Sequence, residues 1–290
     1  MPDVSIEIIQ SYRRKTYRID PSSRIHNREE AVQFVNERGF ISFWPIKDIT
    51  MPSLWVAANG NRPVSDDHDD PGHVTWDWKD DLLGKKKWYY GRVLALKNCM
   101  ISLEMLPYFY ALSPNYGDPE NDYLDDYKKG VLPVEARQVY ETLLKEGEID
   151  SISLRKKSHL GSADSNSRFN KALEILQASF RIAPSGISDA GSWHYSFTYD
   201  LFHKQYPEAV ERSRLISEDI ARNTILKKYF LSVGACTRRD LNKIFRWVPF
   251  ILDQTLHQLR DSGLIQEEIA ISDEKHPYYM LQSLFPSISQ

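Results

Sequence analysis

Apolar positions in the second half of the chain recur with helical spacing and then change to the alternation typical of strands, and this order occurs twice. Three apolar side chains mark one helix face in each copy: Phe169, Leu173 and Leu176, then Leu252, Leu256 and Leu259. Alternating runs follow each helix, at 181–187 and 193–199 and again at 264–271 and 278–284. Each copy therefore predicts a helix followed by a β-hairpin.

The two copies also agree in register. The matching positions are 176–179 with 259–262, and Ile182 with Ile265. Two further helical patterns precede the marked helix in each copy, and three helices followed by a hairpin form the winged helix-turn-helix plan. We therefore predict an α+β fold, mostly α, with clear winged-helix modules at 133–203 and 218–290.

The N-terminal part predicts a third, divergent copy of this module at 28–116. Asn27 caps a helix at 28–38, and Gly39 ends it. The other predicted elements are helices at 51–58, 74–83 and 85–96 and hairpin strands at 100–103 and 108–112. An arm with a basic patch at 1–27 and linkers at 117–132 and 204–217 complete the chain.

An acidic loop at 61–73 interrupts this divergent copy. Its titratable residues are Asp66, Asp67, Asp69, Asp70, His68 and His73. Aspartate and histidine are ligands for divalent ions, but their spacing here matches no known ligand template. A solvated acidic loop is the favoured interpretation, and no metal site is predicted.

Charge and composition narrow the class of protein. The 290-residue chain carries a net charge of −3, which argues against a uniformly basic nucleic-acid coat but allows local basic faces. No charged-then-apolar leader and no apolar run of about 18 residues is present, so we expect a cytoplasmic protein without a membrane segment. No glycine-rich phosphate loop occurs, and no nucleotide or other cofactor is expected.

The polar residues of the predicted third helices suit DNA recognition. A winged helix usually places this helix in the major groove, where Asn and Gln pair with adenine and Arg with guanine. In the second module these residues are Asn166, Arg168, Asn170, Lys171 and Gln177, with Arg155, Lys156 and Lys157 nearby for phosphates. The third module offers Arg238, Arg239 and Lys243, but aspartates on its third helix make the fit worse. Double-stranded DNA is the expected partner, and protein contact is the alternative that the fold also supports.

Aromatic residues and lysines interleave in the first module. The rings are Trp76, Trp78, Trp88, Tyr89 and Tyr90, and the neighbouring cations include Lys85, Lys86 and Lys87. Such a mixture suits base stacking with phosphate contact, although rings also fill cores. Because Trp76 and Trp78 are two residues apart on a predicted helix, one of them should lie near the surface.

Local aromatic anchors give the chain a family resemblance. The anchors are 39–44 after the first helix, 74–79, Leu82 and Leu83, followed by the paired C-terminal modules. Over about residues 27–285 the chain resembles the AlkZ/YcaQ-like DNA glycosylases, a bacterial group that removes alkylated bases and unhooks crosslinks. The resemblance implies a Gln-x-Gln or Gln-x-Asp pair that positions the attacking water just after the first helix.

This chain departs from that pattern, because Ser42 and Trp44 occupy the two places of the pair. A relocated carboxylate is one alternative, and Asp77 is its best candidate, since an apolar setting raises the pKa of a carboxyl group. An extruded base would then enter a pocket lined by Ser42, Trp44, Trp76, Trp78 and Tyr89. Three hypotheses stand: a DNA-binding protein that lacks the usual pair and recognises damaged or distorted DNA, an active glycosylase, and a protein-interaction module.

Overall fold

The computed structural model describes residues 4–115, 117–191, 194–271 and 274–285. Three modules within it repeat one order of elements. Module 1 comprises α2 (Arg28–Arg38), β1 (Phe40–Ser42), α3 (Leu54–Asn59), α4 (Val74–Leu83), β2 (Tyr89–Arg92) and β3 (Asn98–Ile101). Module 2 comprises α7 (Val134–Glu146), β4 (Ile149–Asp150), α8 (Ser151–Lys157), α9 (Asn166–Ala178), β5 (Ile182–Ser188) and β6 (Ser196–Leu201). Module 3 comprises α12 (Glu218–Val233), β7 (Ala235–Thr237), α13 (Arg238–Phe245), α14 (Pro249–Asp261), β8 (Ile265–Ile269) and β9 (Tyr278–Leu281).

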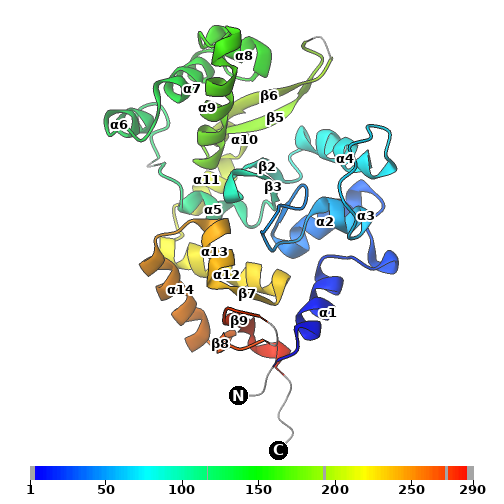
Figure 1. Ribbon diagram of the computed structural model, residues 1–290. Coiled ribbons are helices and arrows are strands. Elements are labelled where there is room, and N and C mark those ends of the chain that lie inside the picture. The colour runs from blue at the N-terminus through cyan, green and yellow to red at the C-terminus, as the bar shows by residue number, and fades with distance from the viewer. Residues whose placement is uncertain (1–3, 116, 192–193, 272–273, 286–290) are drawn as a thin grey trace, which may run out of the picture.

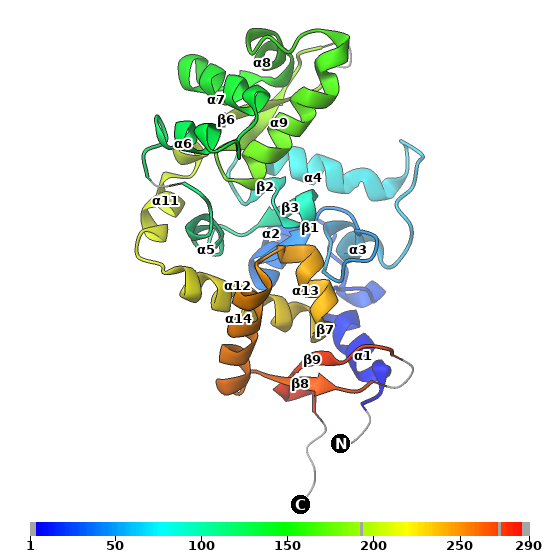
Figure 2. The ribbon, with the colours of Figure 1, turned by 60° about the vertical axis from the view of Figure 1, so that its left-hand side comes forward.

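Each module closes its sheet in the same way. The first strand pairs with the last, so the three antiparallel sheets have the orders β1-β3-β2, β4-β6-β5 and β7-β9-β8. Helix, strand, two helices and a hairpin in this pairing follow the winged-helix plan. Figures 1 and 2 show module 2 at the top, module 1 in the middle and module 3 below. The protein is therefore an α+β fold, mostly α, as predicted.

Helix ends follow local sequence signals in all three modules. The Asn27 side chain accepts a hydrogen bond from the Glu30 amide at the start of α2, and Asp150 does the same for two amides of α8. Thr237 and Asp240 form a reciprocal capping box at the start of α13. The cap at Asn27 confirms the predicted start of the helix at 28–38.

Two predicted elements of module 1 are wrong. The helix expected at 85–96 is instead β2 followed by a short 3-10 turn, η3 (Leu94–Leu96), and the strand expected at 108–112 is part of helix α5 (Leu106–Ala111). Long-range packing decides both: β2 pairs with β3, and α5 packs against α11 (Pro207–Ser213) and α12. Tertiary contacts override local propensity in segments this short.

Segments outside the modules are also structured and packed. The N-terminal arm contains α1 (Ile6–Thr16), which packs on module 3, and the Arg13 guanidinium donates to the backbone oxygens of Val233 at 3.0 Å and Ala235 at 2.6 Å. The segment at 117–132 contains α6 (Asp122–Lys128), and 204–217 contains α11. Helix α10 (Phe202–Gln205) joins module 2 to α11. These segments connect the modules through helices and not through extended chain alone.

The main hydrophobic core belongs to all three modules. It contains Phe40 and Tyr89 of module 1, Ala183 of module 2 and Leu226 and Phe230 of module 3. Separate smaller cores lie inside module 2 and on the helical face of the module 1 sheet. The sheet of module 1 is thus covered on both faces, which fixes the ends of its strands relative to the other modules. Within the described ranges, no helix is long and apolar enough to cross a membrane.

Candidate nucleic-acid interface

Helix α9 presents a polar face over its first two turns. Asn166, Arg168, Asn170 and Lys171 are all exposed there, as expected from the sequence. Arg168 lies 3.4 Å from a carboxylate oxygen of Glu135, and Lys171 pairs with Glu174. Exposed ion pairs contribute only about 0–1 kcal/mol, so these cations can exchange a carboxylate for a phosphate at little cost.

Gln177 does not belong to this exposed face, and its predicted exposure is wrong. Its side chain is buried, and its Nε2 donates to the Leu173 oxygen at 3.1 Å. The last turn of α9 packs against module 1, whose Tyr89 hydroxyl donates to the Gln177 oxygen at 3.4 Å. The polar positions of α9 continue to Gln177, but module 1 covers this C-terminal end of the helix.

The predicted phosphate contacts on α8 separate into different roles. The Arg155 guanidinium donates to the backbone oxygens of Leu160, at 2.7 Å, and Ser162, so it stabilises the loop between α8 and α9. Lys157 pairs with Glu146 at the end of α7. Lys156 is exposed and has no ion-pair partner among the described residues. Of the three, Lys156 is thus the one without an ion pair or side-chain hydrogen bond in the part of the chain that the structure describes.

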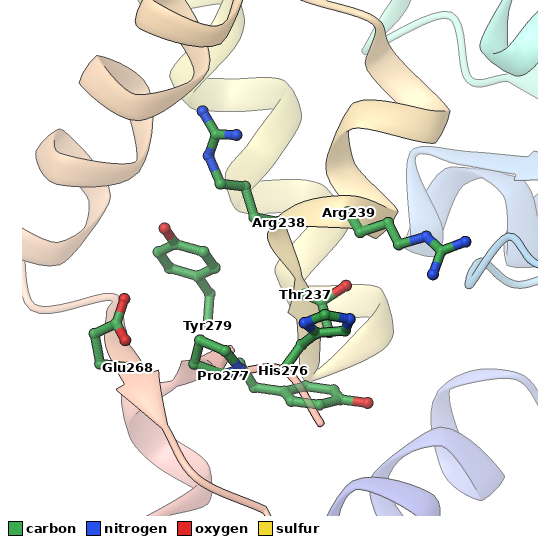
Figure 3. Close-up of a pocket in the computed structure, with 8 residues that line it drawn as sticks. Thr237, Arg238, Arg239, Glu268, His276, Pro277 and Tyr279 are labelled. Atoms are coloured by element: carbon green, nitrogen blue, oxygen red, sulfur yellow. The ribbon is translucent and has the colours of Figure 1, made fainter. Parts of the chain in front are cut away.

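The three cations of module 3 also differ. Arg238 forms two hydrogen bonds of 2.9 Å with the Asp253 carboxylate, which ties α13 to α14, and the Lys243 ammonium donates to the Asp48 oxygen of module 1 at 3.1 Å. Arg239 is exposed. Figure 3 shows Arg238 and Arg239 pointing away from each other beside a hollow of about 150 Å³, which His276 also lines. Arg238 and Lys243 therefore have structural partners, whereas Arg239 lies open to solvent.

Lys85, Lys86 and Lys87 are exposed in the loop after α4. Lys86 lines a hollow of about 510 Å³ together with Arg212, Glu104 and Glu208. Cations and carboxylates are mixed around this hollow, so its charge does not favour a polyanion in particular.

The end of β1, where the resemblance places the catalytic pair, is closed. Ser42 is fully buried, and its hydroxyl donates to the Pro52 oxygen at 3.3 Å. The Trp44 ring stacks with that of Phe43, at 5.4 Å, and with that of Trp76, at 5.8 Å between centroids. Neither position presents an acid, a base or an amide to solvent.

The expected base pocket does not form from the five residues proposed for it. Trp78, Tyr89 and Ser42 are buried in the interior, and Tyr89 lies in the shared core while Trp78 lies in the core of module 1. Trp76 is 38% exposed and Trp44 is half-buried, so these two rings form a stacked pair at the surface. The expectation that one of Trp76 and Trp78 lies near the surface is confirmed.

Asp77 is exposed on α4, so the apolar setting expected for it is wrong. Residues 76 and 78 flank it in sequence, but their side chains leave the helix in other directions. The next carboxylate on the helix, that of Asp80, pairs with Lys79 and accepts a hydrogen bond from the Tyr195 hydroxyl at 3.1 Å.

Lys79, one of the lysines that the sequence interleaves with aromatic residues, lies in a cage of aromatic rings. Its ammonium is 4.6 Å from the ring centroid of Phe197 and 5.4 Å from that of Tyr90, and it hydrogen-bonds to the Tyr195 hydroxyl at 3.0 Å. Burial lowers the pKa of Lys79, and the contact with Asp80 opposes this shift. Lys79 and Tyr195 are 116 residues apart, so no local pattern joins them.

The acidic loop is held by an arginine. The Arg62 guanidinium donates to the Asp70 carboxylate at 2.9 Å, and this hydrogen bonding holds the pKa of Asp70 well below its usual range. In the part of the chain that the structure describes, no group of three or more His, Cys, Asp or Glu side chains is placed to hold a metal ion.

Three winged-helix modules around a shared core, with a polar third helix exposed on module 2, define a tandem winged-helix protein. The chain belongs to the family described as AlkZ related, which matches residues 25–246. Its fold is similar to that of the DNA glycosylase AlkZ from Streptomyces sahachiroi, with a TM-score of 0.60 and 12% sequence identity over 97% of this chain and 71% of that chain. No curated protein matches the chain. The family that the aromatic anchors indicated is therefore confirmed.

Proposed function

We propose that this protein binds double-stranded DNA and recognises damaged or distorted sites without hydrolysing the N-glycosidic bond. Membership of the AlkZ-related family and a fold similar to that of a DNA glycosylase support a role on DNA. The exposed first two turns of α9 supply the side chains, because Asn170 can read a base edge and Lys171 can bind a phosphate. Lys156 and Arg239 add exposed cations from the second and third modules.

The residues at the end of β1 support the second part of the proposal, that the protein does not hydrolyse the N-glycosidic bond. Orienting or activating water requires a carboxylate, an amide or another acid-base group at the reacting atoms. Ser42 is buried with its hydroxyl bonded to Pro52, and the Trp44 ring lies within an aromatic stack. Asp80 already pairs with Lys79 and Tyr195. We infer that the pair of the glycosylases has been replaced here by packing residues.

Fluorescence anisotropy with a labelled duplex, measured over a range of salt concentrations, tests the binding. We expect measurable affinity at low salt and a linear decrease of log K with log salt. Lys171→Ala should weaken binding on all sequences and reduce the salt slope by about one. Asn170→Ala should cost about 1–3 kcal/mol on a preferred sequence and little elsewhere. The same preparations should release no base from alkylated DNA.

Lys15→Ala is the matched control, because Lys15 is an exposed lysine on α1 and should leave binding unchanged. Absence of duplex binding at low salt would favour a protein-interaction role for the winged helices and refute the proposal. Base release by the wild-type protein would instead support the active glycosylase. Retention of that release in Asp77→Asn would exclude Asp77 as the base.

A further inference from the structure

A hollow of about 210 Å³, lined mostly by residues with apolar side chains, lies where the three modules meet. Its walls include Val93 and Leu94 of module 1, Ala178 and Phe180 at the end of α9, and Ile244 and Trp247 of module 3. The lower end of α9 lies above α13 and the upper end of α14 in both Figures 1 and 2. The hollow is thus bordered by the third helix of module 2 and by the turn that leads into the third helix of module 3.

The hollow is open to solvent and has an aromatic wall. Trp247 is half-exposed, and its ring lies 4.9 Å from that of Phe245, which also lines the hollow. An apolar cavity of roughly 150 Å³ can already accept a benzene ring. This hollow therefore has room for a flat aromatic group that stacks on Trp247.

The backbone around the hollow is strained. Phe180 has φ of 52°, in the left-handed region, at the position where module 3 has Gly263 with φ of 74°. A bulky residue in this region costs roughly 1–3 kcal/mol and persists only where its surroundings hold it. Ala95 and Arg246 beside the hollow also have positive φ, at 50° and 55°. Strain of this kind concentrates at functional sites.

Exposed residues that neighbour the lining in sequence have the features of a nucleic-acid surface. Arg246 lies between the lining residues Phe245 and Trp247, and Lys97 follows the 3-10 turn that contains Leu94. Both cations are exposed, and neither forms an ion pair within the described ranges. Val248 and Phe250, which follow Trp247, are 65% and 73% exposed. Exposed apolar side chains next to unpaired cations can contact bases and phosphates together.

We propose that this hollow binds a single nucleobase turned out of the stack of a distorted duplex. The base stacks on Trp247 inside the hollow, and Arg246 and Lys97 bind the phosphates on either side of it. This inference rests on the proposed binding of DNA and adds a preference for duplexes in which one base is unpaired. Unstacking an unpaired base costs less than breaking a base pair, which gives the selectivity.

Comparing the affinities of a matched duplex and a duplex with one bulged base tests the inference. We expect the wild-type protein to prefer the bulged duplex by about tenfold or more, as the stacking of one base on an aromatic ring predicts. Ala178→Trp fills the hollow and should abolish the preference while binding to the matched duplex remains. Trp247→Ala removes the stacking ring and should reduce the preference several-fold.

Val134→Trp is the control, because it adds a tryptophan at an exposed position on α7 that does not line the hollow. It should keep the wild-type preference. Equal affinity of the wild-type protein for the two duplexes, or an unchanged preference in both hollow variants, overturns the inference and leaves the proposed binding of double-stranded DNA intact. Failure to bind either duplex refutes that binding itself.

Discussion

Arg181 is a cation held in the interior by two carboxylates. Its guanidinium donates to Asp122 at 2.6 Å and to Asp126 at 2.7 Å, and all three side chains are buried. Arg181 follows α9, whereas both aspartates lie on α6. This trio therefore fastens the helix between modules 1 and 2 onto module 2.

Removing Arg181 should be costly because two buried carboxylates lose their cation. We expect Arg181→Ala to lower the free energy of unfolding by about 3–5 kcal/mol, measured by denaturant unfolding. Arg14→Ala is the control, since Arg14 pairs with Asp20 at the surface and should cost less than about 1 kcal/mol. Equal effects of the two substitutions would show that the trio contributes no more than a surface pair.

Individual site residues show which parts of the site could be predicted from the sequence and which could not. The polar residues of α9 were found from helical spacing, and Asn166 and Asn170 are exposed as predicted. Gln177 continues the same polar line but is buried, because module 1 packs on the last turn. Tyr89 was assigned to a pocket from its neighbours in sequence, whereas strand alternation directs it into the shared core. The exposed face of α9 could be predicted from its own sequence. The contact with module 1 could not, because module 1 lies elsewhere in the chain.

At the scale of elements, the hairpin of module 2 packs on the third helix of module 1. Lys79 and Asp80 on α4 meet Tyr195 and Phe197 of the hairpin, so this helix is covered by a wing. In a DNA-binding winged helix the third helix is usually free to enter the groove. Module 1 therefore uses its third helix for contact between modules, whereas the first two turns of α9 expose a cationic and amide face.

The caged lysine predicts how stability depends on pH. Burial lowers the pKa of Lys79 from its ordinary value of 10.5, so below that pH the unfolded chain binds this proton more strongly than the folded protein does. The contribution of Lys79 to stability should therefore increase as pH rises towards 10.5, the ordinary pKa of a lysine.

Lys79→Met keeps the length of the side chain but removes the charge, and it should cost about 1–2 kcal/mol at neutral pH because Asp80 loses its cation. Denaturant unfolding at several pH values should show this difference from the wild-type protein widening with pH. Lys85→Met, at an exposed lysine in the same module, should show no such trend. A difference that stays constant or narrows would mean that burial does not dominate at Lys79.

Elements with a repeated or capped pattern were predicted correctly, and those fixed by distant partners were not. The helices at 28–38 and 74–83 agree with α2 and α4 residue for residue. By contrast, β2 is a strand because β3 pairs with it, and α5 is a helix packed on α12 although its sequence is rich in aromatic residues. Local signals specify a helix with caps, whereas a four-residue strand needs its partner.

At the scale of the whole molecule, the three modules are joined by one core and should not unfold independently. Phe230 of module 3 lies in the same buried cluster as Phe40 and Tyr89 of module 1. A cavity opened in module 3 therefore removes packing from the sheet of module 1 as well. Tryptophan fluorescence can detect this coupling, because Trp44, Trp55, Trp76, Trp78 and Trp88 all lie in module 1.

We expect Phe230→Ala to lower the free energy of unfolding by about 3–5 kcal/mol, through lost burial and the cavity it leaves. The denaturant midpoint of tryptophan fluorescence, which reports mainly on module 1 because five of the seven tryptophans lie there, should decrease together with that of far-ultraviolet circular dichroism, which reports on all helices. Phe250→Ala removes the same side chain from an exposed position in the same module and should change stability by less than about 0.5 kcal/mol. A fluorescence midpoint that stays at the wild-type value while the dichroism midpoint falls would show that module 1 folds without module 3, and the shared core would then not couple the modules.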